Sequence, residues 1–508
     1  MASSKPSLTQ LTLKNSFWLF AVNLINKLGS MIFTIILIRI LLPADFGIYN
    51  LALSIALILI TFADLGINIT LVRYFAFSIG KGKNQEAAAY FRFLFKIKFV
   101  LTLILSAIIL IISYPLSIHI FKKPELFYPL LISGFYVFVL SIEGFLSSYF
   151  YAIKKVNLIS VREAIVQILK ISLLILIFFL IPSKHYLSSI ILAITFTYLC
   201  LIFFNLYYIS KFSPFLFKKS QSLINKKEVI RYLIFTTIAA ISTIFYGYID
   251  TIMLGLFLPD ASYIGFYRAA FALVFGIAVI LSFGNILLPI FSQLNNRMTK
   301  IAFAKTTRYL FMISIPAAFG LMSLGNYFIR AIFGYEYLSA SILLAILSFL
   351  IIETALNSLF VSTFQAKGVP ERITIPLIVS AVLNILLNII LIKALMPYSL
   401  LMATAGAAIA TIISRYFYLF ILAFYLKKDF NLDLNFKSSI KPIISSIVMI
   451  LFLIILKNIF TDINLYNGLF LVLTGAIVYL VMMIILKGIT KEDFTIAKTF
   501  IRNLFSRR

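Results

Sequence analysis

The stretch RILLPADFGIY, residues 39–49, ends one long apolar run and leads directly into another. Its proline lacks an N–H donor and closes the preceding helix, so the stretch forms a polar corner between two helices. LGLFLPDASYIGFY, residues 254–267, repeats nearly the same corner. When Tyr49 is aligned with Tyr267, a further glycine follows each corner at the same distance, in FADLGIN and in LSFGNIL. The two corners therefore predict a duplicated chain.

The composition places this chain in a membrane. Of its 508 residues, 62% are hydrophobic and only 12% are charged, whereas soluble proteins carry about 25% charged residues. About 20 apolar residues in a helix span the hydrocarbon core of a bilayer, and most of the sequence consists of runs of that length. The short alternating segments of a membrane β-barrel are not the pattern seen here. We therefore predict an all-α polytopic membrane protein.

The apolar runs predict about 14 transmembrane helices, arranged as two six-helix lobes around a central cavity, with two extra helices at the C-terminus. The predicted spans are 16–42, 47–75, 90–113, 126–153, 160–182, 187–210, 229–258, 262–292, 305–329, 338–366, 372–396, 400–426, 439–457 and 467–487. The predicted domains are a cytoplasmic N-terminus (1–15), an N-lobe (16–210), a basic cytoplasmic linker (211–228), a C-lobe (229–426), helices 13 and 14 (427–488) and a basic cytoplasmic tail (489–508).

The distribution of positive charge predicts the orientation of the chain in the membrane. The chain has 44 Lys and Arg residues against 17 Asp and Glu, and most of the basic residues fall in the loops that lie on the side of the two termini. The opposite side carries only Arg39, Lys122, Lys123, Lys184, Arg268, Arg330, Lys393 and Lys457. Short basic loops stay in the cytoplasm, so both termini are predicted to be cytoplasmic. The same charge would attract anionic membrane lipids, and it does not require nucleic acid as a partner.

Few residues are suited to metal binding or to covalent chemistry. Cys200 is the single cysteine and lies in an apolar run, while His119 and His185 are far apart in the sequence. A phosphate-binding loop of the form GxxxxGK followed by Ser or Thr is absent, which argues against ATP hydrolysis by this chain. We expect no metal, no cofactor and no enzymatic activity.

NLINKLGSMIFTIILIRILLPADFGIYNLALSIALILITFADLGINITLVRYFA, residues 23–76, resembles the opening of polysaccharide flippases of the O-antigen transporter type. These proteins belong to the multidrug/oligosaccharidyl-lipid/polysaccharide exporter superfamily. The matching elements are the corner at 39–49, DLG at 64–66, and Arg73 with Ala76. YIDTIMLGLFLPDASYIGFYRAAFAL (248–273) and LLPIFSQL (287–294) also resemble the family. The resemblance covers essentially the whole chain, but it does not specify the substrate.

The resemblance implies a flippase of the cell (plasma) membrane that works by alternating access. Such a protein would move a polyprenyl-diphosphate-linked oligosaccharide from the cytoplasmic to the outer leaflet for cell-surface polysaccharide or glycan synthesis. A monomer is expected, with a glycan polymerase or glycosyltransferases as possible partners. A multidrug or cation antiporter of the same fold is an alternative. A membrane glycosyltransferase or polymerase is a further alternative, although the short predicted outer loops argue against it.

Charged residues within the spans are the candidate site residues, because each costs about 2.5–3.5 kcal/mol at the centre of a membrane helix unless it faces water or a partner. Lys27 and Arg268 are predicted to bind the diphosphate from the two lobes. The alternatives are that Arg268 extends to the outer interface and that Lys27 pairs with Asp64. The further substrate-binding candidates are Asn23, Asn26, Tyr248 and Arg415, the last of which could instead neutralise Glu353.

Carboxyl groups inside the membrane can also exchange protons or bind sodium as a cavity opens and closes. The candidates for ion coupling or gating are Asp64, Glu143, Asp250 and Glu353. Asp64 precedes Arg73 in DLGINITLVR, and a structural ion pair is the alternative for it. Arg39 and Asp45 in the first corner are the candidates for a gate.

Overall fold

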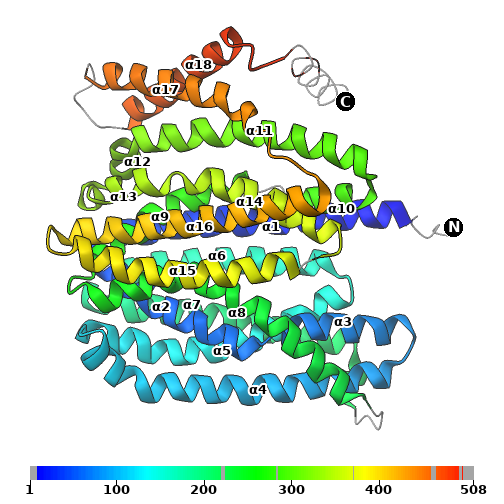
Figure 1. The fold of residues 1–508 in the computed structure, drawn as a ribbon. Helices are drawn as coiled ribbons and strands as arrows, with labels where there is room; N and C mark the ends of the chain where they lie inside the picture. Colours follow the sequence, from blue (N-terminus) through cyan, green and yellow to red (C-terminus); the bar gives the residue numbers. More distant parts are fainter. Residues whose placement is uncertain are drawn as a thin grey trace. The chain divides into compact units, whose positions relative to one another are not determined.

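The computed structural model describes residues 8–218, 224–281, 284–369, 371–458 and 465–490, together with Asp493 and Thr495. This part of the chain is helical throughout (Figure 1). The α-helices are α1 (Leu8–Ile40), α2 (Pro43–Asp64), α3 (Ile67–Gly80), α4 (Asn84–Pro115), α5 (Phe127–Ala152), α6 (Val156–Leu180), α7 (Tyr186–Phe212), α8 (Lys226–Phe257), α9 (Ser262–Ile280), α10 (Gly284–Gln293), α11 (Asn296–Ser323), α12 (Gly325–Ile332), α13 (Ala340–Leu347), α14 (Leu350–Ala366), α15 (Glu371–Leu395), α16 (Leu400–Phe430), α17 (Lys437–Lys457) and α18 (Leu465–Ile485).

The chain divides into two compact units. The first contains residues 1–268 and 384–407, and the second contains residues 269–383 and 408–508. Within the first unit, α4 packs along α3 and α5, and α1 packs along α6. Within the second, α11 packs along α17, and α17 packs along α18 (Figure 1).

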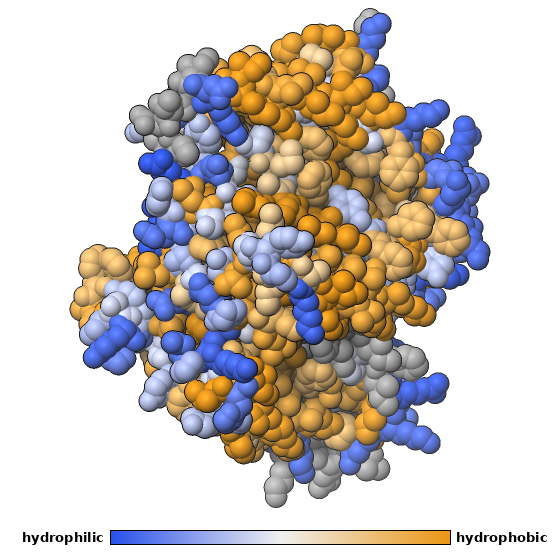
Figure 2. Space-filling model, turned by 60° about the vertical axis from the view of Figure 1, so that its left-hand side comes forward, coloured by the Kyte–Doolittle hydropathy of each residue, from blue (hydrophilic) through white to orange (hydrophobic). Residues whose placement is uncertain are grey.

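The predicted all-helical, multi-pass membrane architecture is confirmed. Among the described residues, 10 helices or joined helices are long and apolar enough to cross a membrane, or 11 if α11 and α12 form one bent span. Hydrophobic residues form most of the surface in the view of Figure 2. The exposed side chains of α4 include Phe99, Val100, Leu103, Ile104, Ile108 and Ile111. The total of about 14 spans stays a prediction.

The buried face of α4 is more polar than its exposed face. Lys98, Thr102 and Ser106 are buried at four-residue intervals and therefore lie on one side of the helix. The Thr102 and Ser141 hydroxyls are 2.9 Å apart, and the Ser106 hydroxyl donates to the carbonyl of Gly134 at 2.7 Å. Polar groups that would be costly in lipid are thus directed at neighbouring helices, where they form hydrogen bonds.

Several of the predicted spans are broken helices. The predicted span 47–75 is interrupted at Leu65 and Gly66, which have φ angles of 42° and 73°. A positive φ is readily adopted by glycine, and here it separates α2 from α3. In the second copy, α9 ends at Ile280 and α10 begins at Gly284, the residue that corresponds to Gly66 in the alignment. The predicted span 305–329 is also broken, with a bend of 76° between α11 and α12. The predicted span 338–366 is divided into α13 and α14.

The two polar corners pack against each other. A Cβ atom built on Gly47 would lie 2.0 Å from the carbonyl oxygen of Ala261, and one built on Gly265 would lie 2.0 Å from the carbonyl oxygen of Pro43. In the alignment, Gly47 corresponds to Gly265 and Pro43 corresponds to Ala261. The contact is therefore reciprocal, as expected of two elements related by a two-fold axis. Glycine is required at both positions because a side chain would collide with the opposite backbone.

This contact predicts the effect of adding one methyl group. Gly47→Ala and Gly265→Ala should each lower the free energy of unfolding by about 1–3 kcal/mol, because the new Cβ must push two backbones apart. Gly80→Ala is the control, since nothing lies within 4 Å of a Cβ at that position. The stability of the purified variants in detergent measures the difference. Equal stability of Gly47→Ala and Gly80→Ala would contradict the close contact.

Candidate functional site

The first unit contains a polar cavity of about 580 Å³. Its walls are formed by α1 to α7, so that the side chains that line it come from seven consecutive helices. The lining residues are Asn26, Ser30, Ile60, Thr61, Asp64, Asn68, Lys98, Leu140, Ser141, Glu143, Gly144, Arg162, Glu163, Val166, Gln167, Lys170 and Tyr198. Most of these side chains are charged, amide or hydroxyl groups, which is unusual within an apolar membrane protein.

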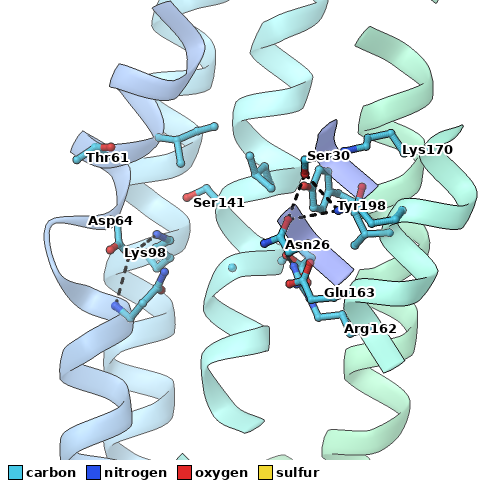
Figure 3. Close-up of a pocket in the computed structure, with 17 residues that line it drawn as sticks. Asn26, Ser30, Thr61, Asp64, Lys98, Ser141, Arg162, Glu163, Lys170 and Tyr198 are labelled. Atoms are coloured by element: carbon cyan, nitrogen blue, oxygen red, sulfur yellow. Dashed lines mark hydrogen bonds and ion pairs between the residues drawn. The ribbon is translucent and has the colours of Figure 1, made fainter. Parts of the chain in front are cut away.

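One wall is organised by an ion pair at the break between α2 and α3. Lys98 Nζ donates to Asp64 Oδ1 at 2.8 Å, and the backbone N–H of Asn68 donates to the same oxygen at 3.3 Å. The Lys98 side chain is 1% exposed, whereas that of Asp64 is 23% exposed. The left-handed turn at Leu65 and Gly66 ends α2 at Asp64, which places its carboxylate both at the cavity and at the start of α3 (Figure 3).

A second charged cluster joins α5, α6 and α7. Arg162 binds both carboxylate oxygens of Glu143 at 2.6 Å, a bidentate pair. Asn205 donates to Glu143 Oε1 at 3.0 Å, and Arg162 also pairs with Glu163. Glu143 is fully buried, and a buried charge of this kind is tolerated only when its partners satisfy its hydrogen bonds.

Amide and hydroxyl groups line the cavity where α1 meets α6. Gln167 Nε2 donates to Asn26 Oδ1 at 3.3 Å and to Ser30 Oγ at 3.4 Å. A Cβ at Gly29 would lie 2.3 Å from the side chain of Gln167, so glycine is what lets the two helices approach. Gln167 Oε1 is buried and has no hydrogen-bond partner in the described part of the chain. It is an acceptor that a hydroxyl group of a ligand could satisfy.

The charges of the cavity balance. Three carboxylates, those of Asp64, Glu143 and Glu163, face three cations, those of Lys98, Arg162 and Lys170. Lys170 forms no ion pair with any described residue, and its ammonium lies 4.4 Å from the centre of the Phe33 ring. Figure 3 shows the Asp64–Lys98 pair on one side of the cavity and Asn26, Ser30, Arg162 and Glu163 on the other. Such a cavity is suited to a polar ligand with many hydroxyl groups.

Three of the residues singled out in the sequence line this cavity, namely Asn26, Asp64 and Glu143. Lys27 follows Asn26 on α1 and is exposed. The side chain of Asn23 lies outside the described residues. Asp64 pairs with Lys98 rather than with Lys27 or Arg73, because α4 places its lysine against the end of α2. Arg73 instead lies over the ring of Tyr232 at 4.3 Å.

A separate cluster in the first unit contains three other predicted residues, Asp250, Arg268 and Tyr248. Tyr267 OH donates to Asp250 Oδ2 at 2.8 Å, and Asn388 Nδ2 donates to Asp250 Oδ1 at 2.9 Å. Arg268, the next residue on α9, donates to Asn50 Oδ1 at 3.2 Å. Its guanidinium also lies 5.9 Å from the centre of the Tyr248 ring.

The remaining predicted residues lie apart from the cavity. In the second unit, Arg415 Nη1 is 3.5 Å from Glu353 Oε2, and both side chains are buried. This is the pairing that the sequence offered as the alternative to a substrate role for Arg415. Arg39, at the end of α1, is exposed, and Asp45, in the first turn of α2, is partly buried.

Lys98, Arg162, Glu163, Gln167 and Lys170 are among the polar residues of the cavity that sequence reasoning missed. Lys98 could have been found from its four-residue spacing with Thr102 and Ser106, which is the pattern of a polar helix face. Arg162 and Glu163 stand near the start of a predicted span, where basic residues are expected at the membrane surface. Only the packing of α6 against α5 places Arg162 beside Glu143.

Comparison with known proteins places the chain among transporters. The model of a family described as "Polysaccharide biosynthesis protein" matches residues 12–295, which is more than half of the chain. The chain is also 26% identical over 202 residues to the "Probable low-salt glycan biosynthesis flippase Agl15" of Haloferax volcanii. This match covers 39% of the chain and 41% of the relative, so it spans about two fifths of the relative's length.

Solved structures share the fold. The lipid II flippase MurJ in an inward closed conformation has a TM-score of 0.72 and 16% identity, over 93% of this chain and 98% of that protein. An inward-facing multidrug resistance transporter of the MATE family, in the MOP superfamily, has a TM-score of 0.57 and 15% identity, over 79% of this chain and 95% of that protein. At these identities the likeness is one of fold.

The ion pairs of the cavity predict a specific pattern of stabilities. Arg162→Gln leaves the Glu143 and Glu163 carboxylates buried without their cation and should cost about 3–5 kcal/mol. Glu143→Gln should cost less, because Arg162 keeps Glu163 as a partner. The double variant Glu143→Gln/Arg162→Gln should therefore cost less than the sum of the two single variants. Unfolding of the purified proteins in detergent gives the three values. Additive costs would show that the two groups do not stabilise each other.

Proposed function

The chain belongs to the polysaccharide biosynthesis protein family, a family of membrane transporters, and from this premise we propose that it flips a lipid-linked oligosaccharide across the bilayer. The proposed substrate is a glycan on a polyprenyl diphosphate, which moves from the cytoplasmic to the outer leaflet for cell-surface polysaccharide or glycan synthesis. The relative Agl15, described as a probable glycan biosynthesis flippase, supports this choice of substrate class.

The observation that carries the proposal is the polar cavity of about 580 Å³ within helices that are otherwise apolar. The glycan of the substrate is polar and must cross the low-dielectric layer, so it needs hydrogen-bonding groups that replace water. Asn26, Ser30 and Gln167 offer amide and hydroxyl groups on one wall. The positive and negative charges of the cavity are equal in number, which suits an uncharged sugar better than a free ion.

The diphosphate of the polyprenyl carrier is negatively charged and requires positively charged side chains of the protein to bind it. Lys27 and Arg268 are our proposed diphosphate ligands. Lys27 is supported by its place on α1, next to Asn26 of the cavity wall, and by its exposed side chain. Lys170 is a third candidate, because it lines the cavity without an ion pair to any described residue. Arginine and lysine both bind phosphate oxygens strongly through charge-assisted hydrogen bonds.

Alternating access of two six-helix lobes is the proposed transport cycle. The reciprocal packing of Gly47 and Gly265 supports a gate at the two corners, since a contact without intervening side chains can separate without rearranging them. Arg39, four residues before Pro43, and Asp45, between Pro43 and Gly47, are the proposed gate residues. The remaining features proposed are a plasma-membrane location, cytoplasmic termini, a monomeric state and cooperation with a glycan polymerase or with glycosyltransferases.

Leaflet exchange in proteoliposomes tests the function. Asn26→Leu/Gln167→Leu should slow exchange of a polyprenyl-diphosphate oligosaccharide at least about 10-fold, because each lost buried hydrogen bond is worth about 1 kcal/mol or more.

Lys27→Gln/Arg268→Gln should abolish exchange while the protein remains folded and inserted. Thr474→Val, at an exposed hydroxyl of α18, is the matched control and should transport normally. Unchanged exchange in both double variants, or transport of a cationic drug in place of the glycan, would refute the proposal.

Ion coupling is proposed at Asp250. Asp250 is buried and accepts hydrogen bonds from the hydroxyl of Tyr267 and the amide of Asn388, and a carboxyl buried inside a membrane protein can exchange a proton or a sodium ion. Asp64, Glu143 and Glu353 are the other coupling candidates.

Asp250→Asn should leave a slow glycan exchange that no longer responds to an imposed proton or sodium gradient, because an amide neither titrates nor balances a cation. Exchange by the unmodified protein should rise with the gradient. Rates in proteoliposomes with and without each gradient provide the measurement. An unmodified protein that ignores both gradients would eliminate the coupling role.

A further inference from the structure

The second unit contains a basic pocket that the proposed transport does not use. Its volume is about 320 Å³, and it lies where the beginning of α17 and the end of α18 meet α11. Four cationic side chains line it, those of Arg308, Lys437, Lys441 and Lys487. The other polar lining residues are Asn435, Ser438 and Thr490. The concentration of positive charge at one small cavity indicates an anionic ligand.

The arginine of the pocket is held in place by the carboxylate of Asp493. Arg308 pairs with Asp493 and donates to the carbonyl of Gly488 at 3.0 Å. Tyr309 OH and the Thr490 N–H also donate to Asp493, at 2.8 Å and 2.7 Å. Burial acts to raise the pKa of Asp493, but the hydrogen bonds from Thr490, Tyr309 and Arg308 outweigh it and lower the pKa to about 2. Asp493 therefore stays ionised and fixes Arg308 at neutral pH.

The three lysines keep their charge available for a ligand. Lys441 Nζ donates to the carbonyl of Lys487 at 2.9 Å, which leaves two of its three N–H donors. No carboxylate in the described part of the chain pairs with Lys437, Lys441 or Lys487. Lys437 is also the first residue of α17, so the positive end of that helix dipole adds to the same pocket.

An apolar cavity of about 410 Å³ adjoins the basic pocket. The two cavities share Met312 in their walls. Tyr479, which lines the apolar cavity, lies one helical turn before Met483, which lines the basic pocket. The hydroxyl of Tyr479 donates to the carbonyl of Met312 at 2.7 Å. Cationic side chains thus lie directly beside a space lined by Leu453, Leu471 and Ala476.

We propose that the basic pocket of Arg308, Lys437, Lys441 and Lys487 binds the phosphate of an anionic membrane phospholipid, with an acyl chain in the adjoining apolar cavity. The combination of the two cavities identifies a lipid, since a free phosphate would have no use for the apolar one. The basic pocket, at about 320 Å³, has room for a phospholipid headgroup. The lipid is a resident one that holds α11, α17 and α18 together, and the proposal does not depend on which substrate the protein transports.

Retention of lipid during delipidation tests the proposal. The full-length protein is purified from membranes that contain phosphatidylglycerol and phosphatidylcholine, and native mass spectrometry measures the lipid that remains bound. The unmodified protein should retain phosphatidylglycerol in preference to phosphatidylcholine. The triple variant Lys437→Gln/Lys441→Gln/Lys487→Gln should weaken this retention about 100-fold, because each lysine contributes about 1 kcal/mol to the binding of an anionic lipid. Lys154→Gln/Lys211→Gln/Lys218→Gln removes the same charge from exposed positions outside the pocket and should retain the lipid.

A second variant and a second ligand distinguish a site for a lipid from a site for a free anion. Ala476→Trp fills the apolar cavity and should reduce retention of phosphatidylglycerol, although the lysines remain. Phosphatidylglycerol should protect Lys441 and Lys487 of the unmodified protein from an amine-reactive reagent, and millimolar inorganic phosphate should not. Equal retention by the triple pocket variant and the triple control would overturn the proposal. Equal protection by inorganic phosphate would also overturn it, in favour of a site for a free anion.

Discussion

A charged side chain inside a membrane-spanning helix needs an opposite charge or water, and this requirement organises the interior of the first unit. The bidentate pair of Arg162 with Glu143 joins α5 to α6, and the Asn205 amide extends it to α7. The pair of Lys98 with Asp64 likewise ties α4 to the break between α2 and α3. Each pair satisfies charges that would cost several kcal/mol alone, and together the pairs surround the polar cavity.

The same pairing decides what the cavity is suited to hold. Because its carboxylates and cations are equal in number, the cavity lacks the excess of positive charge that the proposed diphosphate substrate would need. The groups left to meet a ligand are chiefly amides and hydroxyls, and the buried Gln167 Oε1 lacks a partner among the described residues. An uncharged glycan matches such groups. In the proposed function, the positive charge for a diphosphate comes from Lys27 and Arg268, with Lys170 of the cavity as a third candidate.

Much of the fold could be predicted from sequence, because apolar runs and repeated corners are local patterns. The helical membrane class and the family resemblance are confirmed, and Gly47 and Gly265 of the two corners meet in space. The ion-pair partner of each buried charge was less predictable. Asp64 was a candidate, but its partner Lys98 was not, because the rotation of α4 against α2 decides which cation faces it. The breaks at Gly66 and near Gly284 were also missed, since hydropathy continues unchanged through them.

Access of water to the cavity is the most direct test of this account. Cys200 is the single cysteine, so Cys200→Ser gives a cysteine-free background into which Ser30→Cys is introduced on the cavity wall. Thr474→Cys on the exposed face of α18 serves as the comparison in lipid. The account predicts that a water-soluble thiol reagent modifies Cys at position 30 much faster than at position 474, and that lipid-linked oligosaccharide slows the reaction. Equal, slow modification at both positions, with no protection by the glycan lipid, would contradict it.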